Sequence, residues 1–207
     1  PVTLVCTENT HNAAGGTVWP VELLAEVAAA AHARGLATHM DGARLWNAAA
    51  ASGRDLREIT AGFDTVSVCF SKGLGAPMGS ALVGRRDLIT RARRFKQMFG
   101  GGFRQAGMMA AGALFAVQHH RERLADDHAT ANRLAAGLTE IPGLAVDTGR
   151  VVTNMFYFDV LSMDAGRFAE ACADEGVLML PYGNTIRAVT NLHVTAADID
   201  EALRIIA

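Results

Sequence analysis

Three short polar clusters carry the residues best able to do chemistry in this sequence. The first cluster is Glu8–Asn12, the second is Asp41–Arg44, and the third is the pair Ser71 and Lys72. Each follows a short apolar run that is typical of a buried strand. In open α/β sheets, ligands bind beyond the carboxyl ends of the strands. We therefore expect the three clusters to converge if their strands share one sheet.

A lysine and a carboxylate at neighbouring strand ends favour chemistry on an electrophilic aldehyde cofactor. Lys72 would hold pyridoxal phosphate (PLP) as a Schiff base. Asp41 would pair with the pyridine nitrogen and keep it protonated, which deepens the electron sink. Lysine is rare here, since 19 residues are Lys or Arg and only Lys72 and Lys96 are lysines. No Cys/His cluster has the spacing of a zinc site, so we expect no metal.

Each of these residues also has a purely structural interpretation. Lys72 could be a solvent-exposed turn lysine, and Arg44 could lie on the surface of the next helix. Asp41 could be the N-cap of a helix that starts at Ala43, a position that favours aspartate. The basic run between residues 85 and 104 could be a solvated helix face or an oligomer contact. These alternatives stay open at the level of single residues.

Composition limits the class of protein. The chain has 207 residues, of which 50% are hydrophobic and 19% charged, so it can bury a core. Its formal net charge of −2 argues against nucleic acid or an anionic membrane as a partner. The apolar runs are too short to cross a bilayer, and Pro1–Cys6 does not read as a signal peptide. The three cysteines are far apart and lie in apolar runs, which indicates reduced thiols in a cytoplasmic protein.

The elements that must position the clusters alternate between strand and helix as far as residue 84. This alternation predicts an α/β fold with a mostly parallel sheet. Residues 86–141 read as helical with one break at 99–103 and with further breaks allowed near Gly112 and Gly137, and the remainder reads as a small α+β domain. We therefore expect a large domain over residues 1–140 and a small C-terminal domain over residues 141–207. Strands are expected over residues 2–6, 36–40, 64–70, 80–84, 153–160, 177–180 and 187–189, and helices over 20–35, 43–51, 165–175 and 196–206.

Five segments taken together resemble the low-specificity L-threonine aldolases. They are Glu8–Asn12, His39–Arg44, Cys69–Ser80, Gly100–Gln105 and Ile186–Leu192, and they occur in order over nearly the whole chain. The Ser-Lys-Gly-Leu-Gly block, joined to Asp-Gly-Ala-Arg upstream, is the most specific part. The resemblance implies the fold of the PLP-dependent transferases (fold type I), with a large PLP domain and a small C-terminal domain. It also implies a homo-oligomer, a dimer or a tetramer.

The resemblance assigns a role to individual residues. Lys72 is implied to be the catalytic Schiff-base lysine, and Asp41 the partner of the pyridine nitrogen. Arg44 is implied to lie near the phenolic oxygen of the cofactor and the substrate carboxylate. Arg187 is implied to clamp that carboxylate, and His11 to belong to the substrate pocket.

The implied reaction is retro-aldol cleavage of L-threonine or L-allo-threonine to glycine and an aldehyde. Lys72 and Asp41 would serve another PLP lyase or an aminotransferase equally well, and a non-catalytic fragment of such an enzyme is a further alternative. The family's phosphate loop and ring-stacking histidine come from sequence that precedes Pro1. We therefore expect the 207 residues alone to bind PLP weakly and to expose an apolar sheet edge or face.

Overall fold

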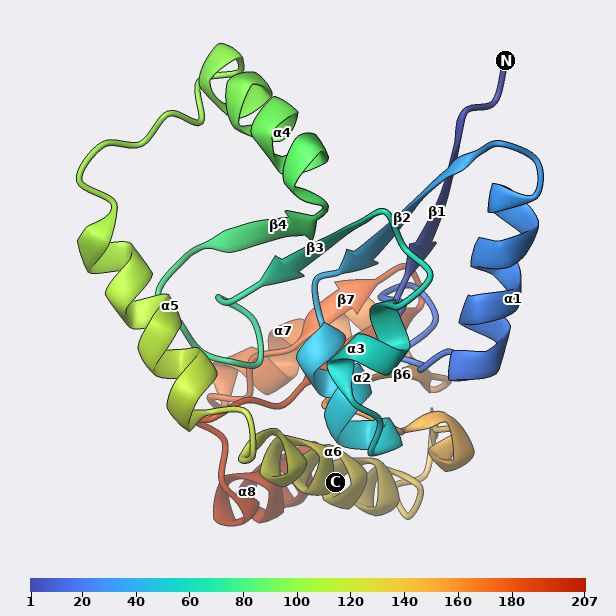
Figure 1. The fold of residues 1–207 in the computed structure, drawn as a ribbon. Helices are drawn as coiled ribbons and strands as arrows, with labels where there is room; N and C mark the ends of the chain where they lie inside the picture. Colours follow the sequence, from blue (N-terminus) through green and yellow to red (C-terminus); the bar gives the residue numbers. More distant parts are fainter. The chain divides into compact units, whose positions relative to one another are not determined.

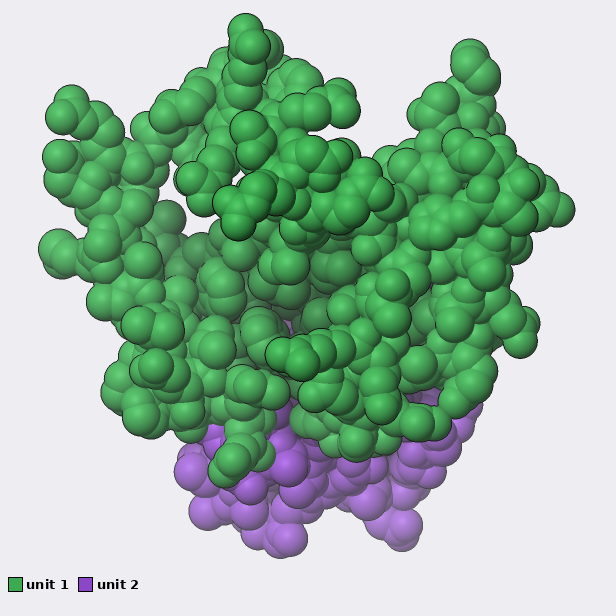
Figure 2. All heavy atoms as spheres, viewed as in Figure 1, with its two compact units in different colours: residues 1–10, 18–122 green, residues 11–17, 123–207 purple.

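The computed structural model describes residues 1–207, which divide into two compact units (Figure 2). Unit 1 comprises residues 1–10 and 18–122, and unit 2 comprises residues 11–17 and 123–207. Unit 2 begins earlier than the expected boundary after residue 140, because the helix over residues 124–138 buries its apolar face in the core of unit 2. The division into domains at residue 140 remains a prediction.

The sheet of unit 1 has four strands in the order β1-β2-β3-β4 (Figure 1). These strands are β1 (Leu4–Glu8), β2 (Ala37–Gly42), β3 (Thr65–Cys69) and β4 (Ser80–Gly84). The first three are parallel, and β4 runs antiparallel to β3 at the edge of the sheet. The expectation of an α/β fold with a mostly parallel sheet is thus confirmed, and β4 is the exception.

Three helices cover one face of this sheet (Figure 1): α1 (Val21–His32), α2 (Leu45–Ser52) and α3 (Leu56–Thr60). Their apolar side chains pack against those strand residues that alternate toward the helices. The buried core of this layer consists of Leu24, Met40, Leu45, Ile59, Val66 and Val68. The opposite face of the sheet therefore carries the other set of alternating side chains.

The helices α4 (Arg86–Met98) and α5 (Gly107–His119) contribute little to the core of unit 1 (Figure 1). No residue of α4 is buried, and α5 buries only Ala113 and Ala116. The expected break at 99–103 is present, but the second break falls at residues 120–123, and α5 and α6 run through Gly112 and Gly137 without interruption. At this second break, the imidazole of His120 contacts the backbone carbonyl of Leu74. Large apolar side chains are exposed along this segment: Phe95, Met98, Phe99, Phe103, Met108, Leu114 and Phe115.

Unit 2 combines a second sheet with three helices. The sheet order is β5-β6-β8-β7, with β5 (Leu144–Ala145), β6 (Met155–Val160), β7 (Leu180–Tyr182) and β8 (Thr185–Val189), all antiparallel. One face packs against α6 (Leu124–Leu138), α7 (Ala165–Asp174) and α8 (Ala196–Ile206). A short 3₁₀ turn, η1 (Thr148–Arg150), precedes β6. The small α+β unit predicted at the C-terminus is present, although β7 starts at Leu180 and not at Val177.

Hydrogen-bonded caps fix where several of these helices begin. The Asp55 side chain accepts a hydrogen bond from the N–H of Arg57 at the start of α3, and Thr195 forms a reciprocal capping box with Asp198 in α8. No helix of the chain combines the length and the apolar character needed to cross a bilayer.

Candidate active site

The carboxyl ends of β1, β2 and β3 lie at one edge of the parallel sheet, as expected. Glu8 at the end of β1 is paired in register with Asp41 near the end of β2, and Asp41 is paired with Ser67 of β3. Strand β3 ends at Cys69, and Lys72 follows in the connection to β4. Glu8, Asp41 and Lys72 therefore lie at the same edge of the sheet of unit 1.

Asp41 presents its carboxylate on the face of the sheet that α1, α2 and α3 do not cover. Its neighbours Met40 and Gly42 are buried, whereas Asp41 itself is exposed. The Oδ1 atom accepts a hydrogen bond from the N–H of Ala43 at 3.0 Å. Helix α2 begins only at Leu45, and its N-cap is Arg44. The alternative that Asp41 caps a helix starting at Ala43 is therefore wrong.

The segment that carries Lys72 is held by backbone hydrogen bonds on both sides. The carbonyl of Lys72 accepts the N–H of Gly75 at 2.8 Å, and the carbonyl of Phe70 accepts the N–H of Ala76 at 2.9 Å. Gly75 has φ of +71°, a conformation that glycine adopts without steric cost. Leu74 is buried, so the segment is anchored while the side chain of Lys72 stays exposed. The amine of Lys72 is thus presented on a fixed turn.

Two side chains from elsewhere in unit 1 also fix this segment. Nδ1 of His120 lies 2.7 Å from the carbonyl oxygen of Leu74, and the indole N–H of Trp46 donates to the carbonyl of Cys69 at 3.1 Å. Neither contact was foreseen from the sequence, because both join residues far apart in the chain. Arg44 lies at the N-cap position of α2 and is half-buried.

Arg187 lies in unit 2, at the centre of β8. It is paired with Tyr157 of β6 on one side and with Leu180 of β7 on the other, so these three side chains share one face of the sheet. The opposite face holds the apolar residues Phe156 and Ile186, which pack against the helices. Arg187 therefore projects from the face that the helices leave open.

Residues 11–17 form a loop that belongs to unit 2 and lies on this open face. The loop is closed by a bridge between His11 and Thr17, and the hydroxyl of Thr153 donates to the carbonyl of Gly16 at 2.9 Å. A Cβ at Gly16 would lie 2.4 Å from the Thr153 hydroxyl oxygen, and its φ is +75°, so only glycine fits there. Nη1 of Arg187 donates to Oδ1 of Asn12 at 3.2 Å. His11 and Arg187 therefore both belong to unit 2, and the loop that contains His11 contacts Arg187 through Asn12.

The Asn12 contact was missed at the sequence level. The segment Glu8–Asn12 is a candidate for chemistry by its residue types, but nothing in its sequence indicates that Asn12 has a partner 175 positions away. A hollow of about 290 Å³ adjoins the same loop, and its lining includes Gly15, Tyr157 and Tyr182. Tyr157 and Tyr182 meet edge to face, with ring centroids 5.7 Å apart.

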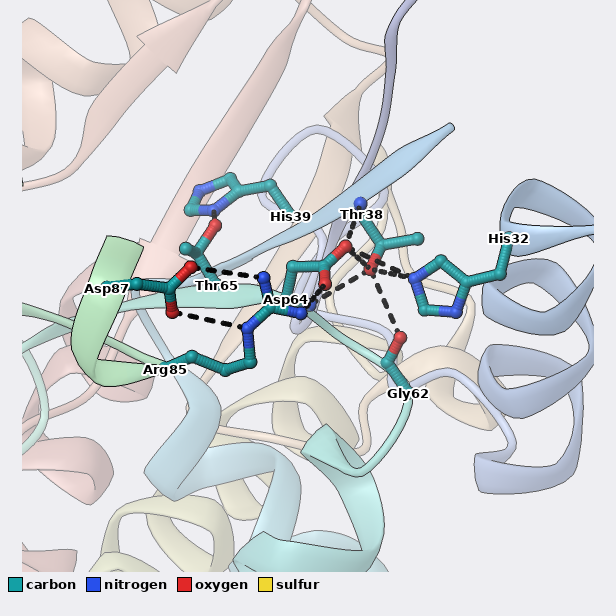
Figure 3. Close-up of polar contacts among 8 residues, drawn as sticks. All are labelled: His32, Thr38, His39, Gly62, Asp64, Thr65, Arg85 and Asp87. Atoms are coloured by element: carbon teal, nitrogen blue, oxygen red, sulfur yellow. Dashed lines mark hydrogen bonds and ion pairs between the residues drawn. The ribbon is translucent and has the colours of Figure 1, made fainter. Parts of the chain in front are cut away.

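A separate polar cluster surrounds Asp64 at the amino end of β3, the opposite end of that strand from Lys72 (Figure 3). Its Oδ2 atom accepts the N–H of Thr38 at 2.9 Å, and Nε2 of His32 lies 3.2 Å from the same atom. Arg85 lies between Asp64 and Asp87, with Nη1 at 3.7 Å from Oδ1 of Asp64 (Figure 3). The hydrogen bond from Thr38 and the contact with His32 hold the pKa of Asp64 below its ordinary value.

This Asp64 cluster consists of groups that satisfy one another. The hydroxyl of Thr38 donates to the carbonyl of Gly62 at 3.1 Å and also accepts the N–H of Asp64 at 3.0 Å. The Asp64 cluster ties the end of α1 to β2 and β3, so the role of the cluster is structural.

A family model described as beta-eliminating lyase matches residues 1–161. The chain belongs to the beta-eliminating lyase family. It is 41% identical over 198 residues to the low specificity L-threonine aldolase of Escherichia coli (strain K12), an alignment that covers 96% of this chain and 57% of that protein. The chain therefore spans little more than half the length of this relative.

Two solved structures illustrate the similarity of this chain to known folds. The Leishmania major threonine aldolase matches 99% of this chain with a TM-score of 0.79 at 20% identity, and the match covers 60% of that structure. A PLP-dependent aminotransferase from Streptococcus suis matches 98% of this chain with a TM-score of 0.71 at 15% identity, over 56% of its own length. At these identities the likeness shows the fold alone, which this chain shares with a PLP-dependent aminotransferase.

Proposed function

We propose that this chain is part of a PLP-dependent aldehyde-lyase that cleaves L-threonine and L-allo-threonine to glycine and acetaldehyde. The observation that carries the proposal is the placement of Lys72 and Asp41 at one edge of the parallel sheet, in a chain 41% identical to an L-threonine aldolase. When bound, PLP supplies an electron sink for the electron pair released as the Cα–Cβ bond breaks.

The residues present fit this cofactor. Lys72 offers an exposed amine on an anchored turn, and Asp41 offers a carboxylate on the uncovered face of the same sheet. Lys72 would bind the aldehyde carbon, and Asp41 would hold a proton on the pyridine nitrogen. Arg44, at the start of α2, would lie near the phenolic oxygen and the substrate carboxylate.

Arg187 would bind the carboxylate of the amino-acid substrate. A guanidinium has planar N–H groups that match a carboxylate in two-point contact, so it fixes orientation as well as charge. A fixed orientation is what keeps the scissile Cα–Cβ bond aligned for cleavage. The buried Nε of Arg187 has no hydrogen-bond partner in the chain, which supports a ligand at this position.

His11 would contribute a polar atom to the substrate pocket. Its Nδ1 accepts the N–H of Ala14 at 3.1 Å, and this contact orients the ring within the loop.

A β-eliminating PLP lyase or an aminotransferase is the second candidate function, because the fold is shared with an aminotransferase. Acetaldehyde release from threonine, compared with pyruvate release from serine, separates cleavage of the Cα–Cβ bond from β-elimination. A non-catalytic fragment would release neither product and would bind no PLP.

The test compares the only two lysines in the chain. In the holoenzyme, Lys72→Ala should abolish the absorption band of lysine-bound PLP and lower acetaldehyde release by orders of magnitude, with an unchanged far-UV circular dichroism spectrum. Lys96→Ala should keep both the band and the activity. If the Lys72 variant still binds PLP covalently after borohydride reduction, the assignment of Lys72 is wrong.

We also propose a homo-oligomer, dimer or tetramer, and a cytoplasmic location. The exposed apolar side chains of α4 and α5 support association, since large apolar patches mark protein contacts. The three cysteines are unpaired, as is typical of a reducing compartment.

A further inference from the structure

Arg187 is a long, flexible side chain on a rigid strand, so its position depends on what holds the guanidinium. The backbone of β8 is fixed by hydrogen-bonded neighbours on both sides, in β6 and β7. An arginine side chain loses rotamer entropy when it is ordered. A partner that orders it before the substrate arrives would therefore improve binding.

Asn12 is such a partner, and it is itself held in place. Its Oδ1 accepts Nη1 of Arg187 at 3.2 Å, and its carbonyl accepts the N–H of Gly15 at 3.1 Å. The loop around it is closed between His11 and Thr17 and is anchored to unit 2 through Gly16. Asn12 thus lies on a loop that is closed at its ends and fixed at a further point by Thr153, just before β6.

The other edge of the guanidinium has an unsatisfied hydrogen-bond donor. The Nε atom of Arg187 is buried and makes no hydrogen bond, and the hydroxyl of Tyr157, directly across the sheet, is also buried without a partner. Buried polar groups without partners are rare and costly. A carboxylate bound along the Nε edge would satisfy the Nε–H and lie on the same face as Tyr157.

We propose that Asn12 is a positioning residue that holds Nη1 of Arg187, so that the Nε edge of the guanidinium receives the substrate carboxylate. This inference rests on the proposed function, in which Arg187 binds that carboxylate. An asparagine suits this task because its amide oxygen accepts a hydrogen bond and carries no net charge. The positive charge of Arg187 is therefore kept for the ligand, which an aspartate at position 12 would neutralise.

The experiment measures the dissociation constant of glycine for the holoenzyme from the change in its absorption spectrum, with methylamine as a ligand that lacks the carboxylate. Asn12→Ala should raise the glycine constant about tenfold, the scale of one lost hydrogen bond to a charged group. Asn12→Asp, which is isosteric, should raise it at least as much. Neither variant should change methylamine binding, and KM for threonine should rise more than kcat falls. Asn132→Ala, on the exposed surface of α6, is the control and should change nothing.

Arg187→Ala and the double variant Asn12→Ala/Arg187→Ala complete the design. Positioning through Arg187 predicts that the double variant binds glycine no more weakly than Arg187→Ala alone. If Arg187→Ala leaves glycine binding intact, the proposed role of Arg187 fails. If Arg187→Ala weakens binding while Asn12→Ala and Asn12→Asp do not, the inference about Asn12 is overturned. Additive losses in the double variant would overturn it as well.

Discussion

The two units of this chain cover their sheets in different ways. In unit 2, helices α6, α7 and α8 bury one face of the sheet against a large apolar core, and the loop over residues 11–17 lies on the other face. In unit 1, helices α1, α2 and α3 cover one face, while the face that carries Asp41 stays open and α4 buries no residue. Packed faces account for stability, and in each unit the residues to which we assign a role in binding or catalysis, Asp41 in unit 1 and Arg187 in unit 2, lie on the face that the helices leave open.

The largest effect should follow from breaking the packed core of unit 2. Phe158 is 2% exposed and Phe95 of α4 is 47% exposed, so the two phenylalanines form a matched pair. Phe158→Ala should lower the free energy of unfolding by about 3–5 kcal/mol. Phe95→Ala should change it by about 0.5 kcal/mol or less and should instead weaken self-association. Urea denaturation and sedimentation of both variants test this. Equal destabilisation would show that α4 is packed.

A smaller effect is expected at the satisfied cluster around Asp64. Asp64→Ala removes an ionised acceptor from Thr38 and His32, and should lower the free energy of unfolding by about 1.5–3 kcal/mol at neutral pH. Because folding lowers the pKa of Asp64, its stabilisation is present above the ordinary carboxyl pKa and is lost as the pH falls through the folded-state value. The difference between variant and wild type should therefore shrink below about pH 4. A difference that stays constant from pH 7 to pH 3 would contradict this account.

On the open face of unit 1, we expect a substitution to change activity and to leave stability nearly unaltered. Asp41→Asn should leave the free energy of unfolding within about 0.5 kcal/mol, since the side chain is exposed and an amide oxygen can still accept the N–H of Ala43. It should lower kcat of the holoenzyme roughly tenfold or more, or about 1.4 kcal/mol, because a neutral pyridine is a poorer electron sink. Steady-state rates of acetaldehyde release measure this. Asp174→Asn, exposed at the end of α7, is the control, and normal turnover in Asp41→Asn would leave Asp41 with its turn contact alone.

Local patterns in the sequence predicted much of the fold. Helix and strand periodicity, together with glycine at turns, located most elements to within a few residues, and the carboxyl ends of β1, β2 and β3 lie at one edge of the sheet as expected. The antiparallel direction of β4 was not predicted, because the strand pattern of residues 80–84 is the same in either direction. The contact between Asn12 and Arg187 was not predicted either, since it depends on how two distant segments pack. Local periodicity in the sequence predicts helices and strands. A site in which a loop packs on a sheet from a distant part of the chain can be predicted only once the fold is known.

The loop over residues 11–17 also determines how this protein can be divided. Because it belongs to unit 2 while its flanking strand and helix belong to unit 1, the chain passes between the units at residues 10/11, 17/18 and 122/123. No single uninterrupted stretch of the gene therefore encodes unit 2. A graft or truncation starting at Arg123 would carry Arg187 without Asn12 and would expose the face around Tyr157 to solvent. Protein engineers who wish to transplant this unit must include the loop as a separate insert or by circular permutation.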